Sequence, residues 1–255
     1  MKKHLKNTLL FFFILFGIAH PQKKETNVLY QYSVINALSA GVYDGDLNVN
    51  ELKKYGNFGL GTFNNIDGEM IVLDGIIYQV KTDGIPVEAD KKLLSPFAAV
   101  TFFRNDKTIE LNTPQTLQQI KKIIDAAVPS ENYLYTVKIS GEFKKVKTRS
   151  VPRQQQPFPD LTSVIKNQVT FEKALINGTV IGFKMPEFID GVNVKSYHFH
   201  FLSGDKRFGG HLLDLVLDKG KIEIGVIKEF RCQLPSTKNY TETKFVKEES
   251  YLPNK

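Results

Sequence analysis

Three histidines lie close together in the C-terminal third of the chain: His198, His200 and His211. The first two are two residues apart in Ser196-Tyr-His-Phe-His-Phe-Leu-Ser-Gly204, so on a strand they point to the same face. The glycine-containing segment 204–210 then predicts a turn that brings His211 alongside the pair. Three imidazoles with an open coordination position are typical of catalytic zinc.

Other interpretations of these histidines stay open on the residues alone. His-x-His strands also occur in the metal sites of cupin-like isomerases and dioxygenases, but those add a glutamate a few residues later, where this chain has Phe201, Leu202 and Ser203. The histidines could also belong to a non-catalytic exported module that only binds metal, or to an ordinary hairpin. Of the five histidines, only His4 and His20 lie elsewhere in the chain. The grouping of the other three within fourteen residues favours a metal site.

The first 19 residues have the pattern of a secretory signal peptide. Lys2, Lys3 and Lys6 precede an apolar run over 9–16, and small residues occupy the −3 and −1 positions of a cut after Ala19. An uncleaved anchor is the less favoured alternative, because a transmembrane helix needs about 20 apolar residues. We therefore expect an exported protein, periplasmic or extracellular, with no membrane attachment in its mature form.

Composition narrows the class of protein. The 255 residues are 42% hydrophobic and 24% charged, which is ordinary for a globular protein that buries a core without disulfides. The net charge of +7 falls by three, to +4, without residues 1–19, and the lysines are interleaved with acids, so nucleic-acid binding has weak support. The single cysteine, Cys232, excludes an intrachain disulfide and a cysteine-rich zinc site.

The elements that position the histidines are mostly strands. Between 58 and 80, short apolar runs separated by Asp-Gly pairs predict a β-meander, and 97–103 is a further strand. Thr113-Pro114 predicts the start of a helix whose apolar spacing continues to Ala127. The remaining elements are expected over 133–139 and 143–151 (a hairpin about Ser140-Gly141), 161–167 (a short helix), 178–184, 194–202, 211–217 and 221–232.

A proline-rich segment, Pro152-Arg-Gln-Gln-Gln-Pro-Phe-Pro159, is the clearest linker, because proline continues neither a helix nor a strand ladder. Because helices are few and strands many, we expect a mixed α+β fold in two packed halves, with this segment between them. The expected parts are a signal peptide (1–19), an N-terminal mixed-sheet half (20–151), the linker (152–160), a C-terminal sheet half with the histidines (161–240) and a tail (241–255).

Nine short stretches form a pattern over residues 28–234. They are Gly41-Val-Tyr-Asp-Gly-Asp46, 55–63, Asp67-Gly-Glu69, Leu73-Asp-Gly75, Ser95-Pro-Phe97, Val100-Thr-Phe-Phe103, 141–149, Tyr197-His-Phe-His-Phe201 and Gly209-Gly-His211. In this order they resemble the bacterial alpha-acetolactate decarboxylases. The resemblance is much more specific than the histidine pattern alone.

The resemblance implies a carboxy-lyase that converts 2-acetolactate into acetoin and carbon dioxide, as in acetoin and butanediol synthesis. It implies an α/β fold of two halves, each built on a β-sheet, with the metal site between them and a homodimer as the usual assembly. The three histidines carry over as ligands of Zn2+. A zinc ion chelated by the ketone and hydroxyl oxygens of a β-keto acid would stabilise the enediolate left by decarboxylation, without an organic cofactor.

Further site residues follow from the resemblance. Arg149 would orient the substrate, since a guanidinium can hold a carboxylate bidentately. Glu69 would supply the proton that decides the product's stereochemistry, and Thr62 would form part of the substrate-binding wall. The family's tail glutamate matches Glu248, with Glu249 as the alternative. On the residues alone, each could instead be an ordinary surface or strand side chain. The resemblance assigns the cysteine no role.

Overall fold

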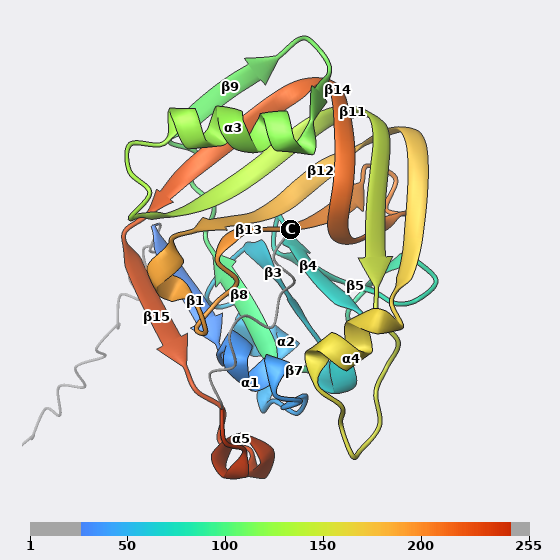
Figure 1. Cartoon of the computed structure of the whole chain (residues 1–255), viewed down its shortest axis with the longest axis vertical. Coiled ribbons are helices and arrows are strands. Elements are labelled where there is room, and N and C mark those ends of the chain that lie inside the picture. Colours follow the sequence, from blue (N-terminus) through green and yellow to red (C-terminus); the bar gives the residue numbers. More distant parts are fainter. Residues whose placement is uncertain (1–26, 246–255) are drawn as a thin grey trace, which may run out of the picture.

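The computed structural model describes residues 27–245, which form two β-sheets packed against one another with a few short helices (Figure 1). The first sheet has the strand order β15 (Glu229–Gln233), β1 (Val28–Tyr32), β8 (Phe97–Thr101), β3 (Phe58–Thr62), β4 (Glu69–Leu73), β5 (Ile76–Val80) and β6 (Pro86–Glu88). The second contains β10 (Gln115–Thr116), β14 (Gly209–Ile227), β11 (Leu134–Ser150), β12 (Val169–Met185) and β13 (Ser196–Ser203), with β9 (Lys107–Leu111) on β14.

The smaller elements lie around these sheets. They are α1 (Ile35–Ser39), α2 (Val49–Leu52), α3 (Leu117–Ala127), α4 (Leu161–Lys166), α5 (Lys238–Glu242), the pair β2 (Leu47–Asn48) and β7 (Leu94–Ser95), and 3₁₀ turns at Asn64–Ile66 and Glu187–Ile189. The predicted mixed α+β class in two packed, sheet-based halves is confirmed. No helix within 27–245 is long and apolar enough to cross a membrane. The expected signal peptide lies outside the described residues.

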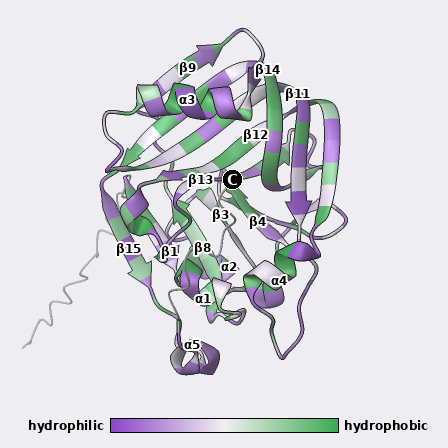
Figure 2. Cartoon of the chain, in the orientation of Figure 1, coloured by the Kyte–Doolittle hydropathy of each residue, from purple (hydrophilic) through white to green (hydrophobic). Residues whose placement is uncertain are grey.

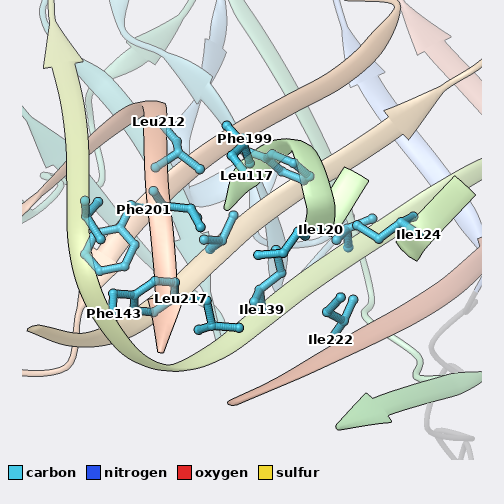
Figure 3. Close-up of a cluster of buried hydrophobic side chains, with 14 of the residues drawn as sticks. Leu117, Ile120, Ile124, Ile139, Phe143, Phe199, Phe201, Leu212, Leu217 and Ile222 are labelled. Atoms are coloured by element: carbon cyan, nitrogen blue, oxygen red, sulfur yellow. The ribbon is translucent and has the colours of Figure 1, made fainter. Parts of the chain in front are cut away.

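Helix α3 covers the second sheet. Its buried positions Leu117, Ile120 and Ile124 pack into a cluster with Phe199 and Phe201 of β13 (Figure 3). The helix begins later than Thr113-Pro114 predicts. The start is later because residues 115–116 still pair with β14 as a strand. Thr116 is the N-cap and forms a capping box with Gln119.

The long strands of the second sheet bend strongly (Figure 1) and contain a row of paired glycines. Gly141 of β11 pairs with Gly178 of β12 on one side and with Gly220 of β14 on the other. A Cβ at Gly141 would lie 2.3 Å from the Lys219 carbonyl oxygen, so a side chain does not fit there. The predicted hairpin about Ser140-Gly141 and the break before 221 are wrong, since these glycines lie within continuous strands of 17 and 19 residues.

This bend closes the second sheet on itself. β14 pairs with β11 and also with β13, while β12 pairs with both β11 and β13, so the four strands form a closed ring of pairings. Apolar and polar residues alternate along these strands, as Figure 2 shows, and the apolar side fills the cluster beneath α3. The closure brings the beginning of β14 against the middle of β13.

The two sheets exchange strands across the expected boundary. β9, β10 and β11 precede residue 152 but lie in the second sheet, whereas β15 follows residue 160 but pairs in parallel with β1. This corrects the halves expected at 20–151 and 161–240. Segment 152–160 joins β11 to α4 and is tied to the first sheet's loops, since the Gln154 N–H donates to the Asn65 carbonyl.

Apolar side chains fill the space between the sheets. Ile71 of β4 and Leu202 of β13 share one buried cluster, and Leu60 of β3 and Phe183 of β12 share another. Because alternate residues of a strand face opposite sides, Glu69 and Thr62 face the second sheet together with Ile71 and Leu60. The packing therefore presents two polar side chains of the first sheet to the histidine-bearing strands.

Candidate metal centre

The three histidines meet where β13 and β14 pair. His198 and His200 lie on β13, and His211 is the register partner of His200 on β14. Their ring centroids are 5.1–5.2 Å apart, and one nitrogen of each lies within 4.8 Å of the others. The predicted alternation is confirmed, since Phe199 and Phe201 point the opposite way into the cluster beneath α3.

One backbone contact decides which nitrogen of His200 is available. The ring is fully buried, and its Nδ1 lies 2.8 Å from the Met70 carbonyl oxygen. A carbonyl only accepts, so Nδ1 carries the proton and Nε2 keeps its lone pair. Metal-binding histidines usually make such a hydrogen bond through the ring nitrogen that does not bind the metal. The sequence does not reveal this contact, because every residue has a carbonyl and nothing marks this one.

Two imidazole nitrogens in this cluster are buried without a hydrogen-bond partner, Nδ1 of His198 and Nε2 of His200. Buried polar atoms are normally satisfied, and an unpaired one is unfavourable by roughly 1–3 kcal/mol. An ion bound between the three rings would satisfy both atoms. The donor set therefore fits a metal, and among the described residues this is the one group of three or more His, Cys, Asp or Glu side chains close enough to hold one.

Burial also sets the protonation state of the rings. Loss of hydration lowers the pKa of His198 to about 3, and the nearby Arg149 charge lowers it further in the same direction. The pKa values of His200 and His211 lie well below the usual range, first through burial and then through neighbouring charges. The imidazoles are thus neutral near pH 7, which metal binding requires.

A largely buried arginine–glutamate pair lies beside the histidines. Glu69 begins β4, Arg149 lies near the end of β11 opposite His211, and Arg149 Nη1 donates to Glu69 Oε1 over 3.0 Å. The other carboxylate oxygen, Oε2, lies 3.5 Å from His200 Nε2. The structure thus brings both predicted side chains to the histidines, one from each sheet.

The environment of Glu69 favours a protonated carboxyl. Its exposed fraction is 6%, and burial raises its pKa, although the Arg149 charge opposes this shift. A buried acid with a raised pKa can donate a proton near neutral pH. Arg149 stays charged and is only 13% exposed in its side chain, so its attraction for an anion is weakly screened by water.

The structure places Thr62 and Cys232 but does not describe the predicted tail glutamate. Thr62 pairs with Glu69 across β3 and β4, but its hydroxyl donates to the Gly68 carbonyl over 2.7 Å. Its proton is thus engaged with the backbone. Glu248 and its alternative Glu249 lie outside the described residues. Cys232 lies on β15 and its Sγ contacts the Ser33 carbonyl at 3.6 Å.

Known proteins share this sequence and architecture. A family model described as alpha-acetolactate decarboxylase matches residues 29–247. The alpha-acetolactate decarboxylase of Methanosarcina mazei is 44% identical over 84% of this chain and 75% of its own length, and that of Bacillus subtilis 37% over 83% of each. The crystal structure of the Bacillus subtilis protein superimposes with a TM-score of 0.84, at 36% identity over 86% of this chain and 93% of the other.

A second solved structure extends the comparison. A Staphylococcus aureus protein, described as of unknown function and similar to alpha-acetolactate decarboxylase, has a TM-score of 0.83 at 32% identity. It is matched over 86% of this chain and 94% of its own. The family match over residues 29–247 spans strands of both sheets and all three clustered histidines.

Proposed function

The chain belongs to the alpha-acetolactate decarboxylase family, a family of carboxy-lyases, and from that premise we propose that it converts 2-acetolactate to acetoin and carbon dioxide with a zinc ion held by His198, His200 and His211. The observation that carries the proposal is the pair of buried, unpartnered imidazole nitrogens next to a buried acid and a buried guanidinium. Membership of this family excludes the alternatives of a cupin-like enzyme and a non-catalytic metal-binding module.

Zinc is the ion that the donor set favours. Three neutral imidazoles without a thiolate suit this borderline ion, and an open fourth position is typical of its catalytic sites. When bound, the ion supplies Lewis acidity, which draws electron density from the substrate's ketone and hydroxyl oxygens.

Arg149 binds and orients the substrate carboxylate. The guanidinium has five N–H donors, and within residues 27–245 its side chain makes one hydrogen bond, to Glu69. The remaining N–H groups can donate to a second carboxylate in a forked geometry. That geometry holds the carboxylate in place until the C–C bond breaks and carbon dioxide leaves with the bonding electrons kept by the substrate.

Glu69 supplies the proton that completes the reaction. After carbon dioxide leaves, the substrate is an enediolate, and protonation of its former C2 carbon yields acetoin. The Glu69 carboxyl lies beside the histidine nitrogens and faces the second sheet, so it can deliver a proton from one side. The carboxylate left on Glu69 then regains a proton from water. One-sided delivery produces one enantiomer.

The direct test combines metal analysis with an activity assay. Purified protein should contain about one zinc ion per chain and should form acetoin from racemic acetolactate. A chelator should remove activity and added zinc should restore it, whereas added magnesium, which prefers oxygen ligands, should not. Full activity in a metal-free preparation would refute the zinc proposal but not the family assignment.

We also propose export and dimerisation. Export rests on the basic, then apolar, then small-residue pattern of 1–19, and cleavage after Ala19 would leave His20 at the N-terminus. Mass spectrometry of protein recovered outside the cytoplasm tests this, and full-length chain found only in membranes would favour an anchor. The homodimer rests on the family resemblance, and light scattering after size-exclusion chromatography tests it.

A further inference from the structure

The turn that leads into Glu69 has an unusual backbone. Asn65, Ile66 and Gly68 all have positive φ angles, of 64°, 53° and 91°. The left-handed region is unfavourable for a β-branched residue such as Ile66, and such conformations persist where the surroundings enforce them. The side chain of Ile66 is buried, which holds the turn against the body of the protein.

Two side chains hold the carbonyls of the two successive peptide groups before Glu69, Asp67–Gly68 and Gly68–Glu69. Gln79 of β5 donates from Nε2 to the Asp67 carbonyl over 2.5 Å, and its Nε2 also lies 3.2 Å from Asp67 Oδ2. Thr62 of β3 donates from its hydroxyl to the Gly68 carbonyl over 2.7 Å. A Cβ at Gly68 would lie 2.5 Å from the Val80 carbonyl oxygen, so β5 also packs directly on the turn.

The two holding side chains approach the turn from opposite faces of the first sheet. Thr62 faces the second sheet, like Glu69. Gln79 alternates with Val80, whose side chain lies in the cluster between the sheets, and shares its face with Ile77, which belongs to the cluster on the far side. Gln79 therefore cannot touch a substrate at the histidines, and any effect of its loss on turnover must act through the turn.

We propose that Thr62 and Gln79 are positioning residues that hold the turn at 64–68 and thereby place the Glu69 carboxyl between Arg149 and His200. The proposal rests on the function proposed above, in which Glu69 is the proton donor. The backbone nitrogen of Glu69 belongs to the second held peptide group, and the carboxyl contacts of Glu69 lie at 3.0 and 3.5 Å, so a small backbone shift would break them. This replaces the expectation that Thr62 binds substrate.

The test is a double-mutant cycle. Thr62→Val and Gln79→Leu remove one hydrogen-bond donor each at nearly constant volume, and both are made in the wild-type and in the Glu69→Gln background. In the wild-type background each should lower kcat about 10-fold or more, since a misplacement of about 1 Å can reduce a rate by as much as 100-fold. In the Glu69→Gln background each should change kcat less than about 2-fold, because coupled residues are not additive.

Controls separate positioning from folding and from substrate contact. Thr62→Ser keeps the donor and should retain most of the activity. Thr136→Val removes a similar buried hydroxyl that contacts the Gly225 carbonyl in the second sheet, and should leave kcat within about 2-fold of wild type. Metal content and the thermal unfolding temperature are measured for every variant. If Gln79→Leu does not fold, the Thr62→Val and Thr62→Ser pair decides alone.

Three results would overturn the proposal. Equal losses in both backgrounds would show that the two residues act independently of Glu69. A raised KM with unchanged kcat for Thr62→Val would show direct substrate contact. Unchanged turnover in both single variants would show that the turn needs neither bond. Failure of the proposed function looks different, because Glu69→Gln alone would then keep the wild-type rate.

Discussion

Replacement of the buried acid is the most informative perturbation of this site. Glu69→Gln keeps the side-chain shape and an oxygen that can accept from Arg149 Nη1, but it removes the transferable proton. Proton transfer by a positioned side chain contributes ~100- to 10,000-fold, which corresponds to ~2.7–5.4 kcal/mol of activation free energy. We expect kcat for acetoin formation to fall within that range.

The structure also predicts what this variant should leave unchanged. Glu69 is not one of the three clustered ligands, so zinc content should stay near one per chain. Arg149 keeps its hydrogen-bond acceptor in this variant, so the loss of unfolding free energy should stay below the ~3–5 kcal/mol that follows when one partner of a buried pair is removed. Glu223→Gln is the matched control, because that nearly buried glutamate pairs with Lys138 away from the histidines.

Two assays read the outcome. Carbon dioxide release gives the rate, and chiral chromatography of acetoin gives the enantiomeric purity. If water replaces Glu69 as the proton source, carbon dioxide release continues slowly and the product loses enantiomeric purity. A wild-type rate together with a single enantiomer would refute the role of Glu69 and would direct attention to Glu248 and Glu249 of the tail.

Three further predictions follow from the same geometry. Arg149→Lys keeps the charge but loses the fork, so activity should fall at least ~10-fold with normal zinc content, as measured by steady-state kinetics and metal analysis; an unchanged KM and kcat would remove Arg149 from the substrate site. His211→Ala should lower zinc occupancy and activity together, and normal values of both would show that His211 is not a metal ligand. The metal-free protein should lose stability as the pH falls below ~6.5, because the unfolded imidazoles then bind protons while the folded ones, with lowered pKa values, do not. Urea denaturation of metal-free protein at pH 7.5 and pH 5 measures this, and equal unfolding free energies at both would contradict it.

Local patterns were sufficient for much of the site. The alternation in β13 places His198 and His200 on one face because side chains of a strand alternate regardless of context. The Asp-Gly pairs likewise predicted the β3–β4–β5 meander, since the positive φ of Gly68 and Gly75 is a local requirement of the turns. These features depend on a few neighbouring residues, so the sequence alone contains them.

Glycines within the long strands show where such reasoning fails. Gly141 and Gly220 look like turns in the sequence, but they face one another across the sheet within strands that continue. Only the register between β11 and β14 reveals this. Gly141 is needed because the backbone of Lys219 and Gly220, more than 70 residues away in the chain, leaves no room for a side chain. The division into halves at 152–160 failed for the same reason, as strands pair by register and burial and not by chain order.

The sequence by itself determined the ligand chemistry, the shared face of the β13 histidines and the family. The tertiary structure alone decided how these groups act together. Packing of β4 against β13 supplies the Met70 carbonyl that leaves Nε2 of His200 free, and the same packing places Glu69 between His200 and Arg149. Burial then lowers the histidine pKa values and raises that of Glu69. Hydration is lost only when the two sheets close over the site, so no property of the separate segments contains these shifts.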